Sequence, residues 1–183
     1  HCDRLKLDQM VKTNKSKHET AFTVSIEAAS GITTGISAKD RSKTIEVASN
    51  PQALSSDIVQ PGHIFPLKAE NGGVLNRSGH TEASIDLARL SGFHPAAVIC
   101  EIMNEDGSMS RRPDLEKFCK KHDLKIGTIA DLINYRLTNE KSIELISESF
   151  IKNKYGEFSF FVYKDSLLNE VHYALKMGEI KSS

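Results

Sequence analysis

The alternation of apolar and polar residues predicts the first elements of this chain. Phe22–Ala28 (FTVSIEA) alternates with a period of two and is rich in β-branched residues, which is typical of a strand with one solvated face. After a glycine turn, Ser37-x-x-Asp40 resembles a capping box and predicts a helix over Ala38–Ser49. The turn ITTG between this strand and this helix therefore lies at a strand-to-helix junction. Pro61–Leu67 (PGHIFPL) is a short apolar segment, and we expect a second strand there.

The middle of the chain alternates between helical and strand patterns. Apolar residues fall at helical spacing over Thr81–Ser91, and Gly92 supplies a C-terminal stop. Ala96–Cys100 (AAVIC) is continuously apolar, which indicates a strand covered on both faces. Pro113 suits the first turn of a further helix, KIGTI predicts another strand, and Thr128 can cap the helix that follows.

The pattern changes after residue 140. From Glu144 onward, two alternating aromatic or aliphatic runs are joined by a polar loop, which predicts a β-hairpin that begins a second unit. We therefore expect one domain over residues 1–140 and a linker with the start of a second domain over 141–183. Because the strands are short and the first is half exposed, we predict an α+β fold, a mixed-sheet α/β sandwich with a C-terminal hairpin.

Composition and charge exclude several classes of protein. Lys plus Arg and Asp plus Glu both number 24, and no long basic run is present, which argues against a nucleic-acid partner. No apolar stretch approaches the roughly 18 residues of a membrane helix, so we expect a soluble cytoplasmic protein. The 3 cysteines have no CxxC spacing, which argues against a disulfide framework and a zinc knuckle.

The loop Arg77-Ser78-Gly79-His80-Thr81 is the strongest candidate for anion binding. A small loop that leads into a helix exposes backbone N–H groups to an anion. Arg77 can add a forked phosphate contact and Thr81 a hydroxyl. Glycine loops before helices are common, however, and a threonine there is often only a cap.

Three further side chains each allow a functional and a structural interpretation. His80 can serve as a metal ligand or be an isolated surface histidine. His63, between Gly62 and an apolar run, suits acid–base work or a hydrogen-bonded core position. Glu101 follows the apolar run AAVIC, so its carboxylate needs a structural partner, a metal or a raised pKa.

Five segments together resemble one enzyme family. They are ITTGISAKDR, QPGHIFPL, GGVLNRSGHTEASIDLARLSG, PAAVICEIMNEDGSM and IGTIADLINYR. In order and approximate spacing they are similar to the 3,4-dihydroxy-2-butanone-4-phosphate synthases, over residues Cys2 to Arg136.

The resemblance implies a lyase that uses magnesium or manganese. It would convert D-ribulose 5-phosphate to L-3,4-dihydroxybutan-2-one 4-phosphate and formate, for riboflavin biosynthesis, as a homodimer. The resemblance makes His80 the metal ligand and assigns proton transfer to His63 and Glu101. It assigns the phosphosugar to Glu101 and to the loop residues Arg77, Ser78, Gly79, His80 and Thr81.

The chain departs from the family pattern in one segment. The family carries an acidic amino-terminal loop of the type Asp-Arg-Glu-Asn-Glu-Gly-Asp, with a second metal ligand, and no such string occurs in these 183 residues. We therefore expect that residues precede His1 in the natural protein and that the isolated chain turns over its substrate negligibly.

The carboxyl-terminal part has a resemblance of its own. Ser149 to Ile180 is similar to the opening hairpin of the GTP cyclohydrolase II domain that follows the synthase in multifunctional proteins.

The alternative hypothesis to an active lyase is a non-catalytic homologue or scaffold domain that retains only phosphosugar binding.

Overall fold

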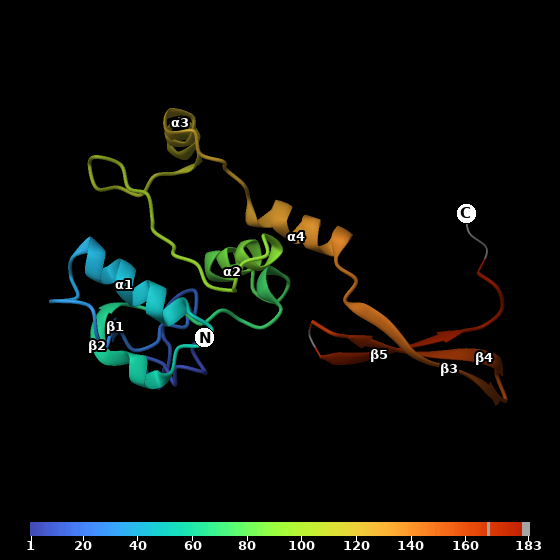
Figure 1. The fold of residues 1–183 in the computed structure, drawn as a ribbon. Coiled ribbons are helices and arrows are strands. Elements are labelled where there is room, and N and C mark those ends of the chain that lie inside the picture. The colour runs from blue at the N-terminus through green and yellow to red at the C-terminus, as the bar shows by residue number, and fades with distance from the viewer. Residues whose placement is uncertain (168, 181–183) are drawn as a thin grey trace.

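The amino-terminal part of the molecule is built on a small antiparallel pair of strands. The computed structural model describes residues 1–167 and 169–180. Strand β1 (Ile26–Ala28) pairs with β2 (Ile58–Ile64), and helix α1 (Ala38–Ser49) lies alongside both (Figure 1). The predicted bounds of α1 are confirmed, because the Ser37 hydroxyl accepts a hydrogen bond from Asp40 N at 3.1 Å and starts the helix there.

The first strand is shorter than its pattern predicted. Residues 22 and 23 make only isolated bridges, Phe22 to Leu67 and Thr23 to Gln9, and regular pairing begins at Ile26. The hydrophobic core lies at this end of the molecule, between the strands, α1 and the amino-terminal turn. Its buried members are Leu5, Leu7, Ile26, Ala53 and Ile58.

Two helices form the second half of the amino-terminal part. Helix α2 (His80–Leu90) lies beside α4 (Ile129–Asn139), and both contact the short 3₁₀ helix η2 (Gly73–Leu75) (Figure 1). The prediction for α2 is confirmed within one residue at each end. Thr128 caps α4 as predicted, since its hydroxyl accepts from Asp131 N at 3.1 Å.

One α-helix and one 3₁₀ helix complete this part of the chain. Helix α3 (Arg112–His122) has Pro113 in its first turn, as predicted. The 3₁₀ helix η1 (Ser55–Asp57) leads directly into β2. In Figure 1 α3 projects away from the β1–β2 pair, at the far end of a long connection from α2.

Two predicted strands are wrong. Ala96–Cys100 forms no regular strand, and its large side chains are exposed, Val98 by 68% and Ile99 by 45%. The segment KIGTI likewise has no strand before α4 begins. A strand needs a neighbour for its N–H and C=O groups. No strand within residues 1–167 and 169–180 pairs with either segment.

The carboxyl-terminal part is a three-stranded antiparallel sheet. Its strands β3 (Ile143–Asn153), β4 (Gly156–Asp165) and β5 (Glu170–Lys176) lie in sequence order, so the predicted hairpin β3–β4 gains a third strand. This sheet lies beyond α4, on the far side from α1 (Figure 1). Leu168 and residues 181–183 of the predicted second unit lie outside the described residues. The change from α4 to β3 falls at residues 140–142, where we predicted the domain boundary, which stays a prediction.

The α+β class is confirmed, with helices and antiparallel strands in one chain. None of the helices in the described ranges has the length and apolar character needed to cross a membrane.

Candidate active site

The predicted anion-binding loop lies at the amino end of α2. Gly72 and Gly73 both have positive φ, 88° and 63°, a region that glycine adopts without strain, and they turn the chain into η2. Helix α2 then begins at His80 with Gly79 as its N-cap, and no side chain caps it. The first-turn N–H groups thus have no side-chain cap, and a helix end of this kind favours an anion.

Arg77 is held by a buried carboxylate that the sequence analysis missed. Its Nη1 donates to Glu82 Oε2 at 2.6 Å, and its Nη2 donates to the carbonyl of His18 at 2.7 Å. The Glu82 side chain is only 1% exposed and also accepts from Glu70 N at 3.0 Å. Two donors of the guanidinium are thus engaged, and the remaining N–H groups are left for a ligand. An acid in the first turn of a predicted helix, five residues after an arginine, was the available signal.

The other loop residues differ in exposure. His80 and Ser78 are exposed, whereas Thr81 is 8% exposed. The His80 ring makes no hydrogen bond or ion pair with residues 1–167 or 169–180, so its nitrogens are open to a ligand. Within the same ranges, no group of three or more His, Cys, Asp or Glu side chains is arranged to hold a metal ion. His80 therefore belongs to no cluster of potential metal ligands among the described residues.

His63 lies in β2 and is paired with Glu27 of β1. Its Nδ1 forms a short hydrogen bond with Glu27 Oε1, while its carbonyl accepts from Arg41 Nη1 at 3.0 Å. The imidazole is 42% exposed and the Glu27 side chain 14%. The sequence did not identify Glu27 as the partner of His63. Its position in the alternating run Phe22–Ala28 indicated only the face of the strand on which its side chain lies.

Glu101 does not occupy the position that we predicted. It is exposed and ends no buried strand, because Ala96–Cys100 lacks strand neighbours in the described chain. Among the described residues, no hydrogen bond or ion pair joins Glu101, His63 and the Arg77–Thr81 loop. The structure thus contains three separate candidate positions, of which His63 and Arg77 each have a carboxylate partner.

The ITTG turn is fixed by a buried carboxylate at the start of α1. Asp40 Oδ2 accepts from the Thr33 hydroxyl at 2.8 Å and from Gly35 N at 3.1 Å. The hydrogen bond from the Thr33 hydroxyl lowers the pKa of Asp40 below its ordinary value. This carboxylate therefore accepts hydrogen bonds in its charged form and holds the turn against α1.

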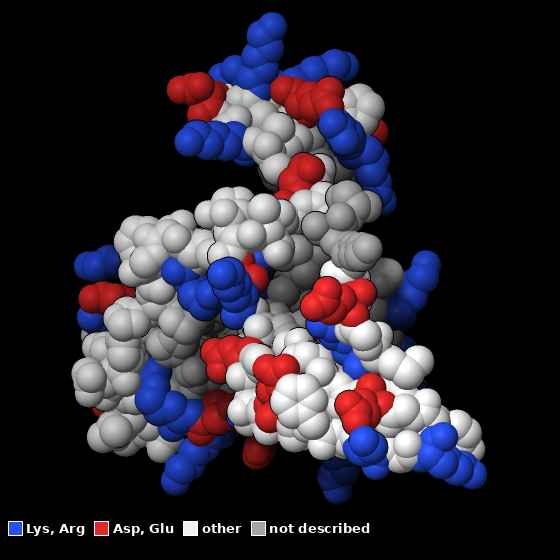
Figure 2. Space-filling model, turned by 90° about the vertical axis from the view of Figure 1, so that its right-hand side faces the viewer, with Lys and Arg blue, Asp and Glu red and all other residues white. Residues whose placement is uncertain are grey.

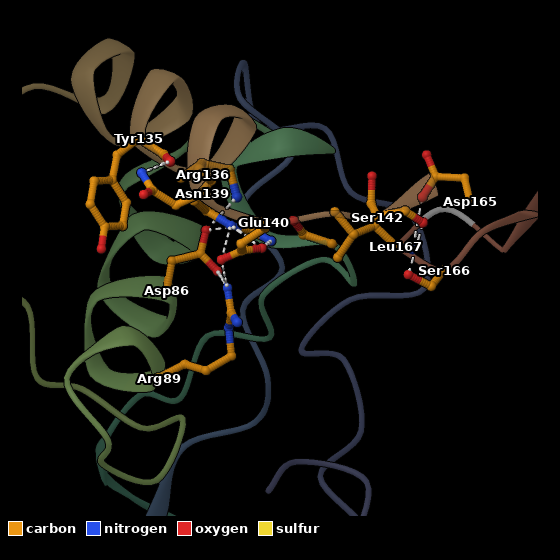
Figure 3. Close-up of polar contacts among 12 residues, drawn as sticks. Asp86, Arg89, Tyr135, Arg136, Asn139, Glu140, Ser142, Asp165, Ser166 and Leu167 are labelled. Atoms are coloured by element: carbon orange, nitrogen blue, oxygen red, sulfur yellow. Dashed lines mark hydrogen bonds and ion pairs between the residues drawn. The ribbon is translucent and has the colours of Figure 1, made fainter. Parts of the chain in front are cut away.

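A buried ion-pair network contacts η2 and α2, the elements on either side of the predicted anion-binding loop. Arg136 of α4 donates from Nη1 to Asp86 Oδ2 at 2.8 Å (Figure 3) and to Gly72 O at 2.7 Å. Asp86 also accepts from Val74 N at 2.9 Å, and Glu140 accepts from Arg136 Nη2 at 2.8 Å. Hydrogen bonds from Arg136 lower the pKa of Glu140. The network joins α2, η2 and α4 into one unit.

Neither sign of charge dominates the face drawn in Figure 2. On the face drawn in Figure 2, Lys and Arg side chains alternate with Asp and Glu rather than forming one continuous field. This distribution agrees with the balanced composition.

Comparison with known proteins gives consistent matches. A family model described as 3,4-dihydroxy-2-butanone 4-phosphate synthase matches residues 1–135. A protein of that name from Pseudomonas syringae pv. tomato is 58% identical over 99% of this chain and 49% of its own length. The riboflavin biosynthesis protein RibBA of Aquifex aeolicus is 53% identical over 98% of this chain and 45% of its own length.

Solved structures agree with the sequence matches. RibBX of A. baumannii, described as a two-domain 3,4-dihydroxy-2-butanone 4-phosphate synthase, is 52% identical. It has a TM-score of 0.86 over 97% of this chain and 52% of its own. A synthase in complex with two magnesium ions is 36% identical, with a TM-score of 0.68 over 75% of this chain and 69% of its own.

The extent of these matches decides what they establish. The chain spans about half the length of the curated relatives it matches. The family model covers well over half of the chain itself, from residue 1 to residue 135. The chain therefore belongs to the 3,4-dihydroxy-2-butanone 4-phosphate synthase family.

Proposed function

We propose that this chain provides the phosphosugar site of a lyase in riboflavin biosynthesis. The reaction converts D-ribulose 5-phosphate to L-3,4-dihydroxybutan-2-one 4-phosphate and formate. The observation that carries the proposal is Arg77, fixed by the buried Glu82 beside the uncapped amino end of α2. An anion at that end would meet oriented N–H groups and a permanently charged guanidinium.

In this proposal the loop binds the phosphate and positions the sugar. Glu82 prevents Arg77 from turning away, because it holds Nη1 from the buried side. Ser78, Gly79, His80 and Thr81 supply backbone or hydroxyl donors around the same anion. Substituting Arg77 with lysine should raise KM, since an ammonium group cannot bind Glu82 and a phosphate in the same planar geometry.

His63 and Glu101 carry the proton transfers of the proposed reaction. His63 has one ring nitrogen engaged by Glu27, and its ring is partly exposed, so the other nitrogen is open to a substrate proton. Glu101 is exposed, and we propose that it reaches the bound sugar.

His80 is the proposed ligand of a divalent cation, magnesium or manganese. Its exposed imidazole fits this role, but it forms no cluster with other potential ligands in the described residues. Substrate oxygens and further carboxylates would have to complete the coordination. When bound, such an ion would stabilise negative charge that develops on the sugar oxygens.

The test compares this chain with an extended protein that adds the family's acidic loop and its flanking strand at the amino end. Formate release from D-ribulose 5-phosphate with magnesium is measured for both. We propose that the extended protein releases formate. In the extended protein, His80→Ala should abolish formate release and weaken metal binding measured by calorimetry. His94→Ala, which changes another exposed histidine, is the control. Unchanged turnover and metal affinity in His80→Ala would reject His80 as a ligand.

A binding scaffold without catalysis is the alternative. It would keep the Arg77–Glu82 arrangement but leave the His63–Glu27 pair without a role. Phosphosugar binding without formate release by the extended protein would favour it. The sheet β3–β5 would then be the start of a regulatory or GTP cyclohydrolase II-like unit, and we propose a homodimer in either case.

A further inference from the structure

Antiparallel pairing of β1 and β2 brings His63 close to Glu27. In the β1–β2 pair Ile26 faces Ile64, but the next residue, Glu27, faces Val59. The residues of β2 between these two partners, His63 among them, are therefore out of the regular ladder. His63 precedes Ile64 on β2 and Glu27 follows Ile26 on β1, so antiparallel pairing puts the two on the same face, and their side chains still meet beside the shift.

The chain leaves room for this carboxylate on two sides. A Cβ atom at Gly35 would collide with the Glu27 carboxylate, and one at Gly62 would collide with the Ile26 backbone and with Glu27 Cγ. Gly62 is held in place because its N–H donates to the Ser25 hydroxyl at 3.1 Å. The Glu27 side chain, 14% exposed, is thus enclosed by two glycines and the imidazole.

The backbone of His63 is fixed as well. Arg41 of α1 donates from Nη1 to the His63 carbonyl at 3.0 Å and from Nε to the Ile36 carbonyl at 2.9 Å. One arginine therefore connects the ITTG turn to the strand that carries the histidine. With its carbonyl and its Nδ1 both engaged, His63 has little freedom to rotate.

The chemistry of the pair follows from its donors and acceptors. An ionised carboxylate only accepts hydrogen bonds, so Nδ1 of His63 is the donor. A neutral imidazole protonated on Nδ1 carries its lone pair on Nε2. We propose that Glu27 is a positioning residue that fixes the tautomer and orientation of His63, leaving Nε2 as the proton acceptor. This role rests on the proposed function of His63.

A structural ion pair is the competing explanation for the same contact. In that case Glu27→Gln, which keeps the size and shape of the side chain, would change stability and leave kcat nearly unaltered. In the positioning role the amide can donate to Nδ1 instead of accepting from it, and the tautomer with Nε2–H becomes populated. Loss of a tautomer-fixing carboxylate lowers kcat by about 10²- to 10⁴-fold.

The experiment uses Glu27→Gln with Glu46→Gln as the control. Glu46 is an α1 carboxylate, 72% exposed, that pairs only with Lys43 in the described chain. We expect kcat for formate release by the extended protein to fall about 100-fold or more in Glu27→Gln. KM should change by less than about twofold, because Glu27 makes no proposed substrate contact. In a His63→Ala background, Glu27→Gln should cause no further loss.

A spectroscopic measurement on this chain is independent of turnover. The ¹⁵N shifts of the His63 ring distinguish the nitrogen that carries the proton, and we expect them to move toward the Nε2–H form in Glu27→Gln but not in Glu46→Gln. Unchanged ring shifts, or a kcat equal to that of the control, would overturn the proposal. If the unsubstituted extended protein releases no formate, the proposed function fails, and the ring shifts alone still decide whether Glu27 fixes the tautomer.

Discussion

Removal of the buried guanidinium of Arg136 tests how the site loop is supported. Its side chain is 2% exposed and donates hydrogen bonds to Asp86 and Glu140 (Figure 3) and to the Gly72 carbonyl. Arg136→Met keeps much of the apolar stem but removes every one of these donors. Among the described residues, Asp86, which is 5% exposed, would keep the Val74 N–H and the more distant Arg89 at 3.9 Å as its polar partners.

The expected cost is large because a charge stays buried without its partner. Breaking a buried ion pair in this way destabilises proteins by about 3–5 kcal/mol. The Glu140 carboxylate adds little to that cost, since it is 21% exposed and still accepts from Arg89 at 2.7 Å. Arg112→Met is the matched control. Arg112 and its partner Glu116 are 77% and 55% exposed, and such i,i+4 pairs contribute about 0.3–0.5 kcal/mol.

Urea unfolding gives the free energy of unfolding of both variants. It is followed by far-UV circular dichroism, because these 183 residues include no tryptophan as a fluorescence probe. Hydrogen exchange at the Val74 amide, which donates to Asp86, adds a local measurement and should accelerate in Arg136→Met. A free energy of unfolding for Arg136→Met within about 0.5 kcal/mol of the Arg112→Met value, with unchanged exchange at Val74, would refute the reasoning.

Three other outcomes are expected. The pKa of Glu140 is lowered in the folded protein. Its contribution to stability is therefore present above the ordinary carboxyl pKa of about 4.3 and is lost as pH falls through the lowered value. The difference in free energy of unfolding between wild type and Glu140→Gln should shrink below about pH 4. Gly35→Ala should destabilise more than Gly107→Ala in urea unfolding, since both have positive φ, 78° and 83°, but only Gly35 lacks space for a Cβ; equal losses would contradict this. Mixing extended His63→Ala and His80→Ala proteins should restore no formate release, and recovery of about a quarter of wild-type activity would show that the two histidines come from different subunits.

The helices of this chain were predictable because local contacts set their ends. Ser37 and Thr128 each accept a hydrogen bond from the amide three residues later, so both helix starts were visible in short stretches of sequence. The prediction of a strand over Ala96–Cys100 was wrong because an apolar run indicates only that a segment tends to be buried. Whether a strand forms depends on a neighbour that the run does not contain.

The same distinction holds for the site. The sequence by itself determined the loop before α2, since a glycine-containing segment and the helix after it are neighbours in the chain. Only the tertiary structure decided which carboxylates serve the candidate residues. Glu27 and His63 are brought together by strand pairing across 36 positions, and Asp86 and Arg136 by helix packing across 50. Such contacts depend on the packing of separate elements, and a pattern within either element cannot specify them.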